Sequence, residues 1–144
     1  MMRWSEEVTN VLERNGLFEN EEHRERFREA VDCYENCSFF TSGLCKCLYL
    51  ASWDMDHFAL ILETLNGLVA RREKTLKDMR IAGEQMVDEM EGGERYVMQL
   101  SVAFLNNESY ELEDSINITA DIQHIIYQAL KAAKLIDEVE AESK

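Results

Sequence analysis

The chain has 144 residues with no proline, and its 29 acidic and 15 basic side chains leave a formal net charge of −14. A chain of this length is most simply a single domain, 1–144, that buries about two-thirds of the surface exposed by its unfolded form. Its charge repels phosphates and anionic lipids, so the sequence argues against nucleic acid and membrane as partners, and the lack of proline indicates a helical chain with short connections.

The apolar residues do not group into a targeting or membrane segment. The opening Met1-Met2-Arg3-Trp4-Ser5-Glu6-Glu7 is not the apolar run of a signal peptide. The run at 58–62 is far too short to span a bilayer. We therefore expect a cytoplasmic protein, in which the thiols stay reduced.

Two short helices are predicted at the start of the chain. Ser5 is a good N-cap for the first helix, and Asn15-Gly16 ends it with a glycine that tolerates a positive φ. Asn20 is placed to cap the second helix. The apolar residues of the second helix share one side: Phe27, Ala30, Val31, Tyr34 and Cys37.

Residues 44–51 are apolar nearly all round, and only Lys46 interrupts them. Such a run is either a fully buried helix or a short strand. We favour the helix, because an isolated strand would have no evident partner. Ser52 or Asp54 would then cap the next element.

A heptad-like pattern dominates the middle of the chain and predicts one long central helix over about 54–90. Its weak point is Asn66-Gly67, but the heptad phase continues through this pair, which favours a continuous or kinked helix over a chain reversal. The spacing alternates between four and three residues. Eight of the ten positions are large and apolar, and the exceptions are Arg72 and Gly83. The ten positions, called the seam below, are Phe58, Leu62, Leu65, Val69, Arg72, Leu76, Met79, Gly83, Met86 and Met90.

Arg72 is the charged member of this seam. Its stem either snorkels along the seam toward solvent, or its charge fixes the register or pairs across a dimer interface. Arg72 also belongs to a cluster of basic residues, which we interpret as a solvated face: Arg71, Arg72, Lys74, Lys77 and Arg80.

The C-terminal third contains one ambiguous segment and one clear helix. Residues 96–112 fit either a helix or a β-hairpin that turns at Asn106-Asn107. Residues 137–144 are predicted to be an acidic, frayed tail. The clear helix before this tail has a single apolar stripe: Ile118, Ile122, Ile125, Ala129, Ala132, Ala133 and Ile136. The predicted fold is therefore an all-α bundle of five or six helices around the long helix 54–90.

Two separated segments resemble small uncharacterised helical proteins of bacterial mobile elements. Residues 18–27, FENEEHRERF, resemble the opening of those proteins, and residues 92–106, GGERYVMQLSVAFLN, resemble a later segment. The seam over 58–90 has no counterpart in that group. The resemblance implies a cytoplasmic accessory protein borne by a phage or plasmid, tilts residues 96–105 toward helix, and carries over no site residues.

The cysteines are the candidate metal ligands, since four thiolates can hold a structural zinc. Their spacing, C-x3-C-x7-C-x-C, is not the paired C-x2-C of zinc ribbons. Two residues two positions apart on a helix also point away from each other, so the third and fourth thiols reach one metal only if that segment is extended. Buried structural thiols are the simpler interpretation of Cys33, Cys37, Cys45 and Cys47.

No catalytic constellation is recognisable from spacing, because His23, His57 and His124 do not form a set and no phosphate-binding loop is present. The leading hypothesis is a non-enzymatic, acidic helical protein that acts by protein–protein binding without a cofactor, with a homodimer as one way to cover the seam. The alternatives are a cysteine-based metal-binding or redox module and a DNA mimic that antagonises a nucleic-acid-binding protein.

Overall fold

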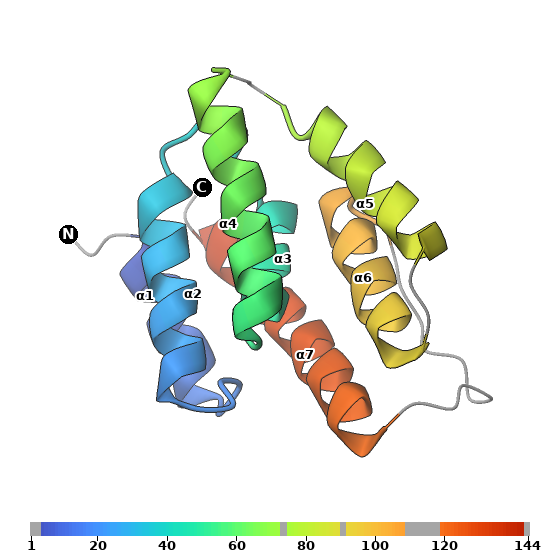
Figure 1. Cartoon of the computed structure of the whole chain (residues 1–144). Coiled ribbons are helices and arrows are strands. Elements are labelled where there is room, and N and C mark those ends of the chain that lie inside the picture. The colour runs from blue at the N-terminus through green and yellow to red at the C-terminus, as the bar shows by residue number, and fades with distance from the viewer. Residues whose placement is uncertain (1–3, 73–74, 90–91, 109–118, 143–144) are drawn as a thin grey trace.

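The computed structural model describes residues 4–72, 75–89, 92–108 and 119–142, which form helices and no strand (Figure 1). The all-α class predicted from the sequence is confirmed. The described part of the chain has seven helices, more than the five or six expected. They are α1 Trp4–Arg14, α2 Glu21–Tyr34, α3 Ser42–Ala51, α4 Met55–Ala70, α5 Lys77–Glu89, α6 Gly92–Leu105 and α7 Ala120–Glu142.

The start of α2 and the end of α1 lie at the predicted residues, whereas Ser5, predicted as an N-cap, lies inside α1, and α2 ends at Tyr34, before Cys37. The Asn20 side chain accepts a hydrogen bond from the backbone N–H of His23 at 2.8 Å, as an N-cap does. Helix α1 ends at Arg14, and Gly16 follows with a φ of 66°. Local capping chemistry therefore sets these boundaries.

The central element is α3, with α2, α4, α6 and α7 packed around it (Figure 1). Every residue from Gly43 to Ala51 is buried, which confirms the prediction of a fully buried helix. At Gly43 the backbone of α3 lies so close to the carbonyl of Phe104 in α6 that a side chain would collide with it. A helix of ten residues, and not the seam, thus organises the bundle.

The predicted long helix over 54–90 is wrong. Helix α4 ends at Ala70, and α5 starts at Lys77 and runs back in the opposite direction (Figure 1). The break comes after Asn66-Gly67, which stays inside α4, where the Asn66 side chain accepts a 2.6 Å hydrogen bond from the Tyr34 hydroxyl of α2. Arg72 is exposed with a φ of 56°, so it belongs to a turn and not to a buried seam.

The C-terminal third is helical wherever the structure describes it. Residues 96–105 lie in α6, so the hairpin is wrong there, and residues 109–112 lie outside the described residues. The apolar stripe of α7 faces the core as predicted over Ile125–Ile136, while Ile118 lies outside the described residues. The segment expected to fray is helical as far as Glu142, and Val139 within it is buried.

The charged residue in the otherwise apolar sequence of α3, Lys46, forms an ion pair. Lys46 is only 7% exposed, and its Nζ lies 2.8 Å from the Asp137 carboxylate of α7. The pair lets a cation lie inside the interface between α3 and α7 because its partner is at the edge of the bundle.

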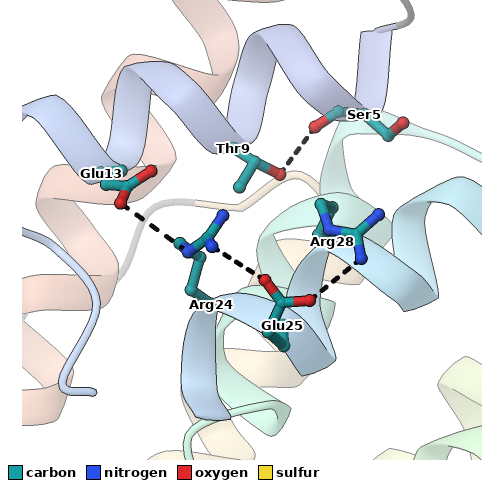
Figure 2. A network of polar contacts seen from close by, with 6 residues as sticks. All are labelled: Ser5, Thr9, Glu13, Arg24, Glu25 and Arg28. Carbon is teal, nitrogen blue, oxygen red and sulfur yellow. Dashed lines mark hydrogen bonds and ion pairs between the residues drawn. The ribbon is translucent and has the colours of Figure 1, made fainter. Parts of the chain in front are cut away.

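Helices α1 and α2 are joined by polar contacts (Figure 2). Arg24 lies 3.7 Å from Glu13 of α1 and 2.9 Å from Glu25, which also binds Arg28 at 3.0 Å. The bond to Arg28 lowers the pKa of the Glu25 carboxyl. In this ladder of alternating charges the Arg24–Glu13 pair links α2 to α1, and the two contacts of Glu25 lie within α2.

A second interhelical contact is fully buried. The His23 ring in α2 lies against the Tyr49 ring in α3, with 4.8 Å between ring centroids. Its Nδ1 accepts from the N–H of Glu19 at 3.1 Å, so Nε2 carries the proton and donates to the Tyr49 carbonyl at 2.9 Å. Burial lowers the pKa of His23 to about 4 and keeps the ring neutral.

Candidate functional site

An apolar groove lies where α4 and α5 diverge above α3 and α6. It encloses about 80 Å³. An apolar cavity of about 150 Å³ holds benzene, so this volume accommodates one aliphatic side chain. The groove is lined by Cys47, Leu50, Ala51, His57, Leu60, Ile61, Thr64, Met79, Ala82, Gly83, Met86, Val97, Met98, Ser101, Val102 and Leu105.

The groove exists because its two walls pack on different helices. Helix α4 packs against α3, whereas α5 packs against α6. On α5 the close approach is made at Gly83, where an added Cβ would lie 2.9 Å from a methyl group of Val102. Two of the wall residues, Leu60 on α4 and Ala82 on α5, are exposed.

A histidine stands at the end of the groove nearest the start of α4. The Asp54 carboxylate caps α4 and lies 2.6 Å from His57 Nδ1. The Trp53 ring stacks against the same imidazole, with 5.9 Å between centroids. The carboxylate and the indole together fix the orientation of the ring, so His57 provides one oriented polar group in an otherwise apolar lining.

The other polar side chains of the groove have intramolecular partners. The Ser101 hydroxyl donates to the Val97 carbonyl at 3.1 Å, and the Thr64 hydroxyl donates to the Leu60 carbonyl at 3.1 Å. Burial raises the pKa of the Cys47 thiol to about 12 and keeps it protonated. These groups are poorly suited to nucleophilic attack, whereas the lining as a whole suits the burial of an apolar side chain.

The candidate metal ligands lie in different environments. Cys33 is exposed, Cys37 is half-buried just after α2, and Cys45 and Cys47 are buried in α3. Within the described residues no three His, Cys, Asp or Glu side chains are grouped as a metal ion would need. Because α3 is helical, Cys45 and Cys47 do not have the extended backbone that a shared metal would require.

The three histidines are dispersed over the structure. His57 lines the groove, His124 is exposed on α7 with Nε2 2.9 Å from Glu19, and His23 is buried between α2 and α3. The buried role of His23 was missed from the sequence, where it stands among surface charges. Its position three residues after the Asn20 cap is the only local signal, since its ring partner Tyr49 is 26 residues away.

Comparison of the chain with protein-family models, with curated proteins and with solved structures found no match. Among the described residues, no helix has the length and apolar character needed to cross a membrane.

Proposed function

We propose that the protein is a non-enzymatic, acidic helical interaction protein that binds an apolar side of a partner protein in the groove between α4 and α5. One observation carries this proposal: the groove is apolar yet open, and Leu60 at its edge is 41% exposed. Open apolar surface beside a closed core is typical of binding sites for protein segments.

The side chains of the groove support a protein partner. Three of the lining residues, Met79, Met86 and Met98, are methionines. Unbranched thioether side chains adapt to the shape of what they contact, which is why methionine is frequent on surfaces that bind other proteins. Two helices with an apolar floor between them also form the kind of groove into which an amphipathic helix fits.

We further infer that the protein acts as an accessory protein of a bacterial mobile element. This part rests on the resemblance of residues 18–27 and 92–106 to small proteins of such elements. A role that depends on contact with another protein is consistent with a groove whose lining is largely apolar.

Photo-crosslinking from inside the groove tests the proposal. The photoreactive residue benzoyl-phenylalanine replaces Ala82, which lines the groove, and in a control it replaces Ala59, which is exposed on α4 and does not line the groove. We expect protein adducts from position 82 in bacterial cells and few from position 59. Equal adducts from both positions, or none from position 82, would overturn the proposal.

A further inference from the structure

The charges at the two ends of the groove differ in sign. Helices α4 and α5 run in opposite directions, so the end of α4 and the start of α5 lie together, and the start of α4 and the end of α5 lie at the other end (Figure 1). The first of these, the basic end, is defined by Arg71, Arg72 and Lys77, all exposed. The second, the acidic end, is defined by Asp56, Asp88 and Glu89, also exposed.

A surface that is positive at one end and negative at the other complements itself after a rotation of 180°. In a two-fold dimer the same patch is used by both copies, and a residue at one end contacts the opposite end of the partner. A basic end then lies against an acidic end twice. We propose that two copies of this chain associate through the α4–α5 face in this way, with Leu60 of each copy over the groove of the other.

This inference rests on the proposed function, since it names a second copy as the protein that the groove binds. Leu60 fits the role on geometric grounds. It is the groove residue that is both large and apolar and still 41% exposed, and the groove has the volume of one such side chain. A symmetric contact would bury both copies of Leu60 at once.

The net charge of −14 opposes a dimer of this kind only weakly at physiological salt. Repulsion between whole molecules acts over long distances and is screened beyond about 8 Å at that ionic strength. The contacts between basic and acidic ends act at short range, where they set the orientation and reject like-charged arrangements.

A charge-swap experiment tests the dimer with the full chain. One variant, Arg71→Glu with Lys77→Glu, makes both ends acidic, and the other, Asp56→Lys with Glu89→Lys, makes both ends basic. Each variant then places like charges together in a self-dimer and opposite charges together in a mixed dimer. We expect each variant alone to dimerise at least about tenfold more weakly than the wild type, and an equal mixture to recover dimers containing one copy of each.

Sedimentation equilibrium measures these species, and far-UV circular dichroism checks that the variants remain helical. If a charge variant loses its helix signal, Leu60→Ser replaces it, with loss of the dimer as the expected result. A monomeric wild type, variants that dimerise like the wild type, or a mixture without recovery would overturn the inference. A monomeric wild type whose position 82 still captures another protein would refute only the dimer, whereas no adduct at all would refute the proposed function as well.

Discussion

The two sides of this bundle differ in how completely their side chains are paired or buried. Polar side chains of α1, α2, α3 and α7 pair with one another. These contacts are the buried His23–Tyr49 hydrogen bond, the Lys46–Asp137 ion pair and the charge ladder around Arg24 (Figure 2). Helices α4, α5 and α6 form a groove over one side of α3, and α4 and α5 leave large apolar side chains exposed to solvent. The first side is closed by contacts within the chain, and the second is the side to which we assign the proposed binding of a partner.

Under the proposed function, this difference separates residues that stabilise the fold from residues that contact a partner. Substitutions in the core between α1, α2 and α7, and at the α3 residues that face them, should reduce the free energy of unfolding and leave the binding surface unchanged. Substitutions at the groove should weaken binding and leave the free energy of unfolding nearly unchanged.

The largest loss is expected from Phe27→Ala. Phe27 is fully buried in α2 and contacts the rings of Phe18 and Tyr49. Removal of a buried phenyl ring leaves a cavity and costs about 3–5 kcal/mol. Urea unfolding followed by circular dichroism measures the loss. A loss below about 1 kcal/mol would mean that this side is not tightly packed.

The second prediction concerns pH. The pKa of His23 is about 4 in the folded protein against an ordinary value of 6.5, so the folded state favours the neutral ring. The neutral His23 ring contributes to the free energy of unfolding in full above pH 6.5. This contribution falls as the pH drops from 6.5 toward 4, and the total loss over that window is about 3 kcal/mol. Urea unfolding at pH 7.5 and pH 5 measures the dependence.

The control for this prediction is the His23→Gln variant, which lacks a group that titrates in this window. We expect it to lose less stability between the two pH values than the wild type does. The variant His124→Gln, at an exposed position, should retain the dependence of the wild type. If His23→Gln shows the same pH dependence as the wild type, another group is responsible.

A smaller effect is expected from the ion pair between α3 and α7. Asp137→Ala leaves the nearly buried Lys46 ammonium without its partner, and because the aspartate side chain is 56% exposed we expect a loss of only about 1 kcal/mol. The double variant Asp137→Ala with Lys46→Met removes both charges and should recover part of that loss. An additive double variant in urea unfolding would show that the two side chains do not interact.

The smallest effect on stability is expected from Leu60→Ser. The side chain is already 41% exposed, so the free energy of unfolding should change by less than about 0.5 kcal/mol. Crosslinking from position 82 should nevertheless fall sharply, because the apolar edge of the groove is lost. A variant that keeps its adducts would show that the groove is not the binding surface.

Much of the fold was predictable because local rules decide it. The Asn20 cap, the end of α1 at Asn15-Gly16 and the apolar stripe of α7 depend on residues within one or two turns of each other. The apolar run at 44–51 likewise indicated a fully buried helix, since no polar face was available for solvent. These elements agree with the structure.

The long helix could not be excluded from spacing, because two separate helices can keep one heptad phase across a turn. The pair that suggested a break, Asn66-Gly67, is held in α4 by the hydrogen bond from Tyr34, a residue 32 positions away. The actual break contains Arg72 in a left-handed conformation, which no sequence rule assigns to arginine. The groove was missed for the same reason, since it exists only because the chain reverses there.

The central claim, that two copies of this chain bind each other through the α4–α5 face, is tested by hydrogen–deuterium exchange of the wild-type chain at low and high protein concentration. We predict that amide exchange in α4 and α5 slows as the concentration rises and that exchange in α1 and α2 does not change. Exchange that is independent of concentration throughout the chain, or that slows in α1 and α2, would contradict the account.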